Sequence, residues 1–186
     1  MRAYLVGKGS QSSNFIQLFP EINFYSISYE QISELGSSDI ERFVIAIGDR
    51  EIAKDATDQM LSSGFRSISL IHRSAIVEKS AKLSEGVCVL ANAYLGPGSV
   101  LGPYVLVNTG GIVEHDSKIG QHTIVAPGAV VLGNVEVGEM CLLGANSTIL
   151  PGLNVARGTT IGAGGTLTKN VLQGNQTLTG VPARVV

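Results

Sequence analysis

From residue 77 to residue 167, an aliphatic side chain recurs at every sixth position of the chain. All sixteen positions hold Val, Leu or Ile, with no residue inserted or lost between them: Val77, Leu83, Val89, Leu95, Leu101, Val107, Val113, Ile119, Val125, Val131, Val137, Leu143, Ile149, Val155, Ile161 and Leu167. A six-residue period with one aliphatic residue per repeat is typical of a parallel β-helix built from hexapeptides. Three hexapeptides then form one triangular coil of 18 residues, and the coils stack at about 4.8 Å, the spacing of paired strands.

The remaining places of the hexapeptides support the same fold. The fifth place is small or aliphatic in most repeats, and the turn positions are rich in Gly, Pro and Asn. Small side chains fit the interior beside the aliphatic residues, and Gly, Pro and Asn suit tight corners. No single hexapeptide buries its aliphatic residue alone, so we expect the repeats to fold as one unit.

The first 74 residues follow a different pattern. Apolar runs predict strands over 3–6, 22–28, 43–47 and 67–71, and helical spacing predicts helices over 14–19 and 31–35 and from Asp49, as an N-cap, to Gly64. This alternation indicates a small α/β, Rossmann-like domain with a parallel sheet. Eight of the ten aromatic residues precede residue 75, and a narrow β-helix has little room for rings. We therefore predict an α/β domain over residues 1–74, followed by a β-helix with a C-terminal tail over 75–186.

Composition excludes several classes of partner. The formal net charge of −2 gives no reason to expect a nucleic acid or an anionic membrane. The chain shows no signal-peptide pattern, and no apolar segment approaches the roughly 20 residues that span a bilayer. Cys88 and Cys141 are expected to be buried thiols in a reducing compartment, without a metal. We expect a cytoplasmic protein.

The parallel sheet of the first domain predicts a ligand site at the carboxyl ends of its strands. Those ends are residues 7–13 and Gly48-Asp49. The first loop has Gly7 and Gly9 but Ser12 where a dinucleotide-binding turn has its third glycine, and the second strand ends without a clear acidic residue. Both departures argue against NAD. A phosphate or sugar-nucleotide group held by backbone N–H groups remains open, as does an ordinary glycine turn.

His115 is the best candidate for chemistry among the three histidines. It holds the third place of its hexapeptide, and the 18-residue period puts Pro97 on one side of it and Gly133 on the other. An imidazole in that open space, followed by the carboxylate of Asp116, suits a general base. A solvated turn histidine is the competing interpretation. His72 is expected to be structural or on the surface, and His122 to pack between Tyr104 and Met140.

The sequence Asn-Thr-Gly-Gly-Ile-Val-Glu-His-Asp at 108–116, the preceding α/β domain and the closing Gly-Val-Pro-Ala at 180–183 carry a family resemblance. Together they resemble the sialic acid O-acetyltransferase NeuD family, and within it the PglD-type nucleotide-amino-sugar N-acetyltransferases. The resemblance covers nearly the whole chain. It implies a left-handed β-helix, a homotrimer, acetyl-CoA as co-substrate with no metal, and a place in surface-polysaccharide biosynthesis.

The resemblance also implies roles for individual residues. His115 would be the general base for the amine of a nucleotide-linked (4-)amino sugar, and Asp116 would raise its basicity. The nucleotide sugar would be held by Gly9, Ser10, Gln11 and Gly48. Acetyl-CoA would run along a groove between two β-helices of the trimer, past Gly133, Gly144, Ala145, Gly162 and Ala163, toward Lys169. From its sequence context alone, Lys169 equally suits a solvated surface position.

Three departures from the family pattern concern binding. Ile124 stands where relatives commonly carry a second histidine, Gln11 stands where they carry a histidine, and the acidic residue after the second strand is missing. Three other functions stay open: O-acetylation of a sugar hydroxyl, a non-catalytic β-helix binding module, and a zinc lyase of the γ-carbonic-anhydrase kind, which needs three histidine ligands. Exposed aliphatic residues such as Leu106, Val130 and Leu142 are expected to be buried by trimerisation. The sequence does not name the sugar, the nucleotide or the pathway.

Overall fold

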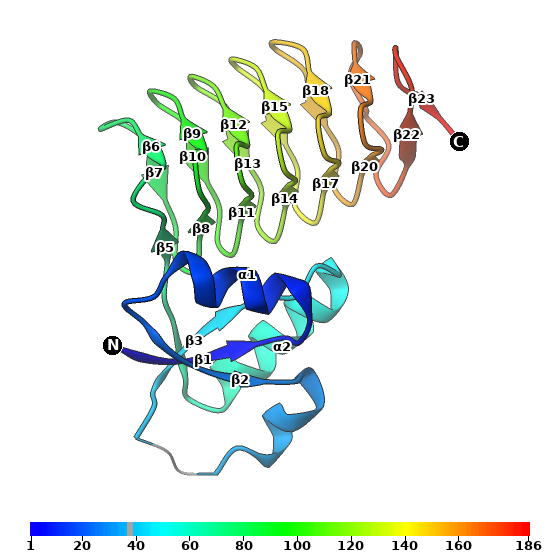
Figure 1. Ribbon diagram of the computed structural model, residues 1–186. Helices are drawn as coiled ribbons and strands as arrows, with labels where there is room; N and C mark the ends of the chain where they lie inside the picture. The colour runs from blue at the N-terminus through cyan, green and yellow to red at the C-terminus, as the bar shows by residue number, and fades with distance from the viewer. Residues whose placement is uncertain (37–38) are drawn as a thin grey trace. The chain divides into compact units, whose positions relative to one another are not determined.

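A computed structural model describes residues 1–36 and 39–186, and these form two compact units (Figure 1). The first unit covers Met1–Ser69 and the second Leu70–Val186. None of the described helices is long and apolar enough to cross a membrane.

The N-terminal unit is a parallel four-stranded sheet, sheet A, with helical segments between its strands. The strand order is β2-β1-β3-β4, so β1 and β3 are central. The elements in chain order are β1 (Arg2–Val6), α1 (Ser10–Leu18), β2 (Asn23–Ile27), the 3₁₀-helix η1 (Tyr29–Glu34), β3 (Arg42–Ile45), α2 (Arg50–Ser62) and β4 (Arg66–Ser67). The predicted α/β class with a parallel sheet is confirmed.

Helix α2 begins where the sequence predicts. Asp49 is its N-cap, and the carboxylate Oδ1 accepts a hydrogen bond from the backbone N–H of Ile52 at 3.0 Å. Glu51 adds a negative charge in the first turn, where the helix dipole favours it. Ala56 and Met60 are fully buried, and they pack with Phe43 of β3 in the core of this unit.

The second unit is a left-handed parallel β-helix of short strands. Its strands are β5 (Leu70–Ile71), β6 (Ile76–Val77), β7 (Lys82–Leu83), β8 (Cys88–Val89), β9 (Tyr94–Leu95), β10 (Val100–Leu101), β11 (Leu106–Val107), β12 (Ile112–Val113), β13 (Lys118–Ile119), β14 (Ile124–Val125), β15 (Val130–Val131), β16 (Glu136–Val137), β17 (Leu142–Leu143), β18 (Thr148–Ile149), β19 (Asn154–Val155), β20 (Thr160–Ile161), β21 (Thr166–Leu167), β22 (Thr177–Thr179) and β23 (Arg184–Val185). Each strand from β6 to β21 ends on one of the predicted aliphatic positions, which confirms the hexapeptide register.

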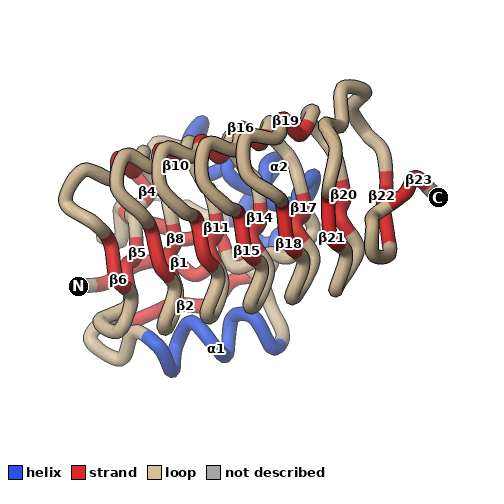
Figure 2. The backbone as a smooth tube through the Cα atoms, turned by 90° about the horizontal axis from the view of Figure 1, so that it is seen from above, coloured by secondary structure: helices blue, strands red, loops and turns tan. Residues whose placement is uncertain are grey.

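Three sheets form the faces of the β-helix. Sheet B has the order β23-β22-β20-β17-β14-β11-β8-β5, sheet C the order β21-β18-β15-β12-β9-β6, and sheet D the order β19-β16-β13-β10-β7. Pairing joins residues that are 18 apart, as in Val100 with Lys118. Figure 2 shows the successive coils side by side along the β-helix.

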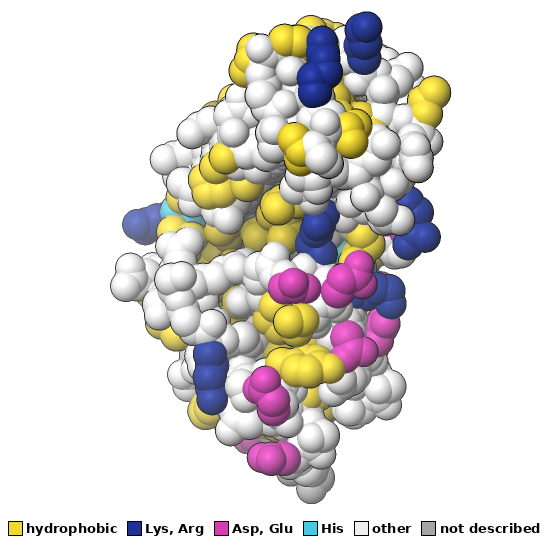
Figure 3. All heavy atoms as spheres, turned by 90° about the vertical axis from the view of Figure 1, so that its right-hand side faces the viewer, with side chains coloured by type: hydrophobic (Ala, Val, Ile, Leu, Met, Phe, Trp, Pro, Cys, Tyr) yellow, Lys and Arg dark blue, Asp and Glu magenta, His cyan; other side chains and the backbone are white. Residues whose placement is uncertain are grey.

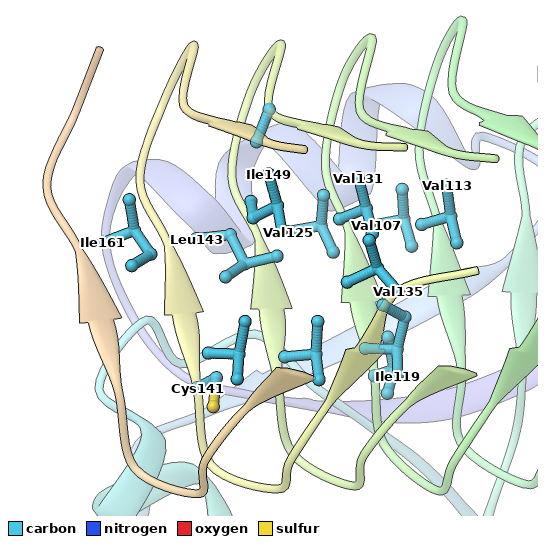
Figure 4. Packing of buried hydrophobic residues seen from close by; sticks show 14 of the residues in the cluster. Val107, Val113, Ile119, Val125, Val131, Val135, Cys141, Leu143, Ile149 and Ile161 are labelled. Atoms are coloured by element: carbon cyan, nitrogen blue, oxygen red, sulfur yellow. The ribbon is translucent and has the colours of Figure 1, made fainter. Parts of the chain in front are cut away.

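The interior of the β-helix is a continuous set of aliphatic ladders. Val113, Val131 and Ile149 point inward from sheet C in successive coils, all fully buried, and Cys141 fills a fifth place nearby (Figure 4). Inward residues at fixed places of an unbroken repeat lie one above another, so each coil covers the apolar surface of the next.

Several predicted boundaries were wrong. Helix α1 starts at Ser10, well before residue 14, so the glycine loop is shorter than expected. The run 67–71 is not one strand: Ser67 ends β4 in sheet A, whereas Leu70 and Ile71 form β5 and pair with Cys88 and Val89 of the β-helix. The division between the units accordingly falls before Leu70 rather than after residue 74.

Candidate active site

One corner of the β-helix carries the predicted catalytic residues. The third place of each hexapeptide lies in the turn after a strand. In the turns that lead from sheet C toward sheet D, this place is held in successive coils by Lys79, Pro97, His115, Gly133, Pro151 and Lys169. We call this set the C–D corner. It places His115, Gly133 and Lys169 on the same edge, as the repeat arithmetic implies.

His115 and Asp116 form a contacting pair at this corner. The imidazole Nδ1 lies 3.1 Å from the carboxylate Oδ2 of Asp116. The side chains are 53% and 63% exposed, so a substrate has access to both. When Nδ1 carries the ring proton, it donates a hydrogen bond to the carboxylate of Asp116. Nε2 then has a lone pair that can accept a proton, which is the tautomer that a general base needs.

The backbone fixes this pair between neighbouring coils. The Asp116 N–H donates to the carbonyl oxygen of Pro97 at 2.9 Å, and the His115 carbonyl accepts from the N–H of Asn134 at 3.0 Å. Asp116 has a φ of 56°, in the left-handed region that Asp tolerates better than most residues. The dyad therefore stands on a rigid turn rather than on a mobile loop.

The residues expected along acetyl-CoA divide between two corners. Gly133 and Lys169 belong to the C–D corner. Gly144, Ala145, Gly162 and Ala163 follow β17 and β20, in the turns that lead from sheet B toward sheet C. We call this second edge the B–C corner. Its two turns are stacked, since the Gly164 N–H donates to the carbonyl oxygen of Ala145 at 2.8 Å.

His122 lies on neither of these corners. It follows β13 in a turn toward sheet B, is 7% exposed, and stacks its ring on Tyr104 with centroids 4.9 Å apart. Its expected place beside Tyr104 is confirmed. Within the chain it does not stand beside His115 to replace the second histidine missing at Ile124. His72 accepts the N–H of Ser74 at Nδ1.

The predicted substrate-binding residues converge in the N-terminal unit. A cleft of about 490 Å³ lies at the carboxyl ends of β1, β2 and β3 and is lined by Gly7, Lys8, Gly9, Ser10, Gln11, Ser28, Tyr29, Glu30, Ala46, Ile47, Gly48 and Ile52. Gly9, Ser10, Gln11 and Gly48 are all in this lining. A methyl group on Gly48 would lie 3.1 Å from Oε1 of Gln11, so the Gln11 side chain lies close to this glycine.

Tyr29 and Glu30 line the cleft but were not predicted. The Tyr29 hydroxyl contacts Asp55 of α2 and accepts a hydrogen bond from Nε2 of Gln59 at 2.9 Å. Its bond to Asp55 raises the pKa of Tyr29 and lowers the pKa of Asp55. The N–H of Glu30 and the Ser28 hydroxyl lower the pKa of Glu30. The carboxylate of Glu30 therefore follows β2, but it lies in η1 rather than at the end of the strand. The only sequence signal for this turn is the capping pattern from Ser28 to Gln31.

The described lining of this cleft carries charges of both signs, on Lys8 and Glu30. Asp and Glu side chains gather over the lower half of Figure 3, where the N-terminal unit lies. Among the described residues that line the cleft, Lys8 is the only cation. An anionic ligand there has to rely on Lys8 and on the N–H groups at the start of α1, whose N-cap Gly9 offers no side-chain bond.

The two cysteines and the possible metal ligands are a separate matter from these two sites. Cys88 and Cys141 are both buried thiols, and burial raises the pKa of the Cys88 thiol to about 12. Within residues 1–36 and 39–186, no three His, Cys, Asp or Glu side chains are grouped to hold a metal ion.

Comparison with solved structures places the whole chain beside sugar acetyltransferases. A variant of GDP-perosamine N-acetyltransferase from Caulobacter crescentus, with one histidine replaced by alanine and in complex with CoA and GDP-perosamine, is 25% identical with a TM-score of 0.92; the match covers 100% of this chain and 97% of the other. The predicted resemblance is confirmed.

A second acetyltransferase gives the same result. The acetyltransferase domain of PglB from Neisseria gonorrhoeae is 26% identical, with a TM-score of 0.92 over 100% of this chain and 99% of that domain. The same domain in complex with acetyl coenzyme A has a TM-score of 0.91 at 26% identity, over 100% and 98% of the two chains. No protein-family model matches the sequence. The similarity to acetyltransferases therefore extends over both units of the chain.

Proposed function

We propose that this chain is an acetyl-CoA-dependent N-acetyltransferase that acts on the amine of a nucleotide-linked amino sugar, as a step of surface-polysaccharide biosynthesis. The observation that carries the proposal is the accessible His115–Asp116 pair on a chain that matches GDP-perosamine N-acetyltransferase over its full length. The N-terminal cleft supplies a separate site for the nucleotide, and the β-helix supplies the base.

The two side chains of the dyad have complementary roles. The amine nitrogen attacks the thioester carbonyl carbon, a C–N bond forms and the C–S bond breaks. Nε2 of His115 accepts the proton that the amine loses and passes it to the departing thiolate. Asp116, bonded to Nδ1, orients the ring and stabilises the imidazolium. General-base catalysis of this kind is worth about 10²–10⁴-fold.

We assign the nucleotide to the N-terminal cleft. Backbone N–H groups at Ser10 and Gln11 and the ammonium of Lys8 offer donors to a diphosphate. Gly9 and Gly48 leave room for the ligand to approach the backbone, and Gln11 replaces the family histidine. The carboxylate of Glu30 offers an acceptor for hydroxyl or amino groups of the nucleoside.

We assign acetyl-CoA to a groove between two copies of the chain. The C–D corner with Gly133 and Lys169 and the B–C corner with Gly144, Ala145, Gly162 and Ala163 are on opposite edges of sheet C, so one copy alone does not bring them together. In a homotrimer, the C–D corner of one copy can face the B–C corner of the next, which closes the ring. Lys169, exposed at the last coil, would meet a phosphate.

The expected interface differs from the sequence prediction in detail. Leu106 is only 9% exposed in the single chain, so trimerisation has little of it left to bury. Val130 lies on sheet C and Leu142 on sheet B, both half-buried. Half-buried Ile112, Val130, Leu132 and Leu150 all belong to the strands of sheet C or the residues just after them, which favours this face.

We also propose a cytoplasmic location, since the two buried thiols agree with a reducing compartment.

The test is a substrate screen with product analysis. The protein is incubated with acetyl-CoA and UDP-, dTDP- and GDP-linked amino sugars, and thiol release and product mass are followed. We expect an amide product from at least one amino sugar. An ester product on a sugar without a free amine, with no turnover of any amine, would replace this proposal by O-acetylation.

A further inference from the structure

Gly133 is unusual among the equivalent positions of the repeat. It is the only glycine in the third place of a hexapeptide from Lys79 to Lys169; the others are Lys79, Glu85, Ala91, Pro97, Pro103, Thr109, His115, Gln121, Pro127, Glu139, Ala145, Pro151, Arg157, Ala163 and Lys169. All the remaining repeats therefore accept a Cβ at this place of the turn. These include His115 and Pro151, which hold it in the two neighbouring coils of the same corner.

The backbone at Gly133 does not require glycine either. Its φ lies outside the left-handed region, unlike that of Gly98 or Gly152. The Gly133 carbonyl accepts the N–H of Gly152 at 3.0 Å, a bond that any residue can make. Neither conformation nor backbone bonding accounts for the absence of a side chain.

What a side chain would meet is the imidazole of His115. A methyl group on the Cα of Gly133 would lie 2.4 Å from Nε2, 2.5 Å from Cε1 and 3.0 Å from Cδ2 of that ring. All three are closer than van der Waals contact, and no backbone atom is among these nearest neighbours. The ring therefore occupies the space that a side chain of residue 133 would fill.

We propose that Gly133 is a positioning residue for His115. Because Gly133 has no Cβ, the imidazole can lie against the next coil. In this position Nδ1 contacts the carboxylate of Asp116 and Nε2 lies beside Gly133. The family resemblance implies that Gly133 lies beside acetyl-CoA, whereas this role acts through His115 and needs no contact with acetyl-CoA. This inference rests on the proposed role of His115 as the base, but the fit between ring and glycine can be measured without any acetyl transfer.

Gly98 shows why Gly133 is the informative position. A methyl group on Gly98 would lie 2.5 Å from Oδ1 of Asp116, but Gly98 has a φ of +72°. A substitution there strains the backbone as well as displacing the carboxylate, so the two effects cannot be separated. At Gly133 the φ is ordinary, and the three atoms nearest to an added methyl group all belong to the ring.

The test compares Gly133→Ala with the wild type, with Glu85→Ala as a matched third-place control at an exposed turn. We expect Gly133→Ala to keep or raise the melting temperature, since alanine lowers the entropy of the unfolded chain. We expect the ¹⁵N chemical shifts of the His115 imidazole to change, and kcat to fall about 10²-fold, as for a misplacement of about 1 Å, with the KM for acetyl-CoA unchanged. Glu85→Ala should change none of these.

A double-mutant cycle makes the coupling explicit. In a His115→Ala background, Gly133→Ala should have no further effect on turnover. If Gly133→Ala raised the KM for acetyl-CoA and left kcat unchanged, Gly133 would act in acetyl-CoA binding and the inference would be overturned. A loss of thermal stability that persists in the His115→Ala background would show a backbone role and overturn it too.

The imidazole spectrum separates this inference from the proposed function. If the protein transfers no acetyl group, the proposed function fails, and the ¹⁵N spectrum alone decides the role of Gly133. An imidazole spectrum identical in the wild type and Gly133→Ala would contradict the positioning role whatever the activity.

Discussion

The two nitrogens of His115 meet different surroundings. Nδ1 faces the carboxylate of Asp116 at 3.1 Å, while Nε2 lies over a glycine. The period of 18 predicted both Pro97 and Gly133 as neighbours of His115, because an unbroken repeat turns sequence spacing into spatial contact. It could not predict the direction of the ring, which depends on side-chain torsions that no pattern encodes.

Lys8 tests the nucleotide cleft at the level of a single charge. Because Lys8 is the only cation in the described part of the cleft lining, Lys8→Gln should weaken binding of UDP, dTDP or GDP. An exposed ion pair is worth up to about 1 kcal/mol, so we expect a loss of up to about fivefold, smaller at high salt. Calorimetric titration measures it, with Lys79→Gln on the β-helix as the control. Equal nucleotide affinities of the wild type and Lys8→Gln at low salt would contradict a contact between Lys8 and the diphosphate.

Cys88 gives a pH-dependent prediction. Burial raises the pKa of its thiol to about 12 in the folded chain, against about 8.5 in an unfolded chain. Above pH 8.5 the unfolded state loses this proton while the folded state keeps it. Cys88 therefore lowers the free energy of unfolding by about 1.4 kcal/mol per pH unit between pH 8.5 and 12.

The comparison is between urea unfolding curves at pH 8 and pH 10 for the wild type and Cys88→Ala. The variant should lose less stability than the wild type over this range. The same loss in both proteins would contradict a buried, protonated thiol.

At the level of elements, the β-helix was predicted more accurately than the α/β unit. Each of the aliphatic residues that recur every six positions from Val77 to Leu167 ends a strand. One aliphatic residue per repeat fixes which residue points inward. In the α/β unit, Gly9 with φ 103° lets α1 begin at Ser10, and η1 places Tyr29 and Glu30 at the cleft. Such local turns depend on tertiary contacts, for example those from Tyr29 to Asp55 and Gln59, which periodicity does not report.

Adjacent leucines of β17 test the inward register. Leu143 is fully buried and Leu142 is half-buried on the outer side of the same strand. Leu143→Ala should reduce the free energy of unfolding by about 2–5 kcal/mol, because it leaves a cavity in a packed ladder. Leu142→Ala should cost clearly less. Denaturant unfolding measures both, and a larger loss for Leu142→Ala would contradict the register.

For the whole molecule, the proposed function assigns the nucleotide to one unit and the base to the other. The cleft at the strand ends belongs to one unit and the His115–Asp116 pair to the other. The composition change near residue 75 predicted this division. Only the family resemblance, and not the repeat pattern, suggested that two corners share the acetyl-CoA site, since their assembly depends on a second copy.

Oligomeric state therefore bears directly on the site. Light scattering should give three times the chain mass of 19.4 kDa at micromolar concentration. Replacing Val130 on sheet C by Lys should shift the mass toward the monomer and reduce acetyl-CoA binding together, because an interface does not accommodate an unpaired charge. A monomeric wild type that binds acetyl-CoA tightly would contradict the shared groove.

The most direct test of the account is the acetyl-transfer rate of His115→Ala on the preferred amino-sugar nucleotide, beside His72→Ala as a control. The account predicts that kcat/KM falls about 10²–10⁴-fold for His115→Ala, with thermal stability retained, because the side chain is exposed. His72→Ala should act like the wild type. Wild-type transfer by a folded His115→Ala protein would contradict the assignment of His115 as the base.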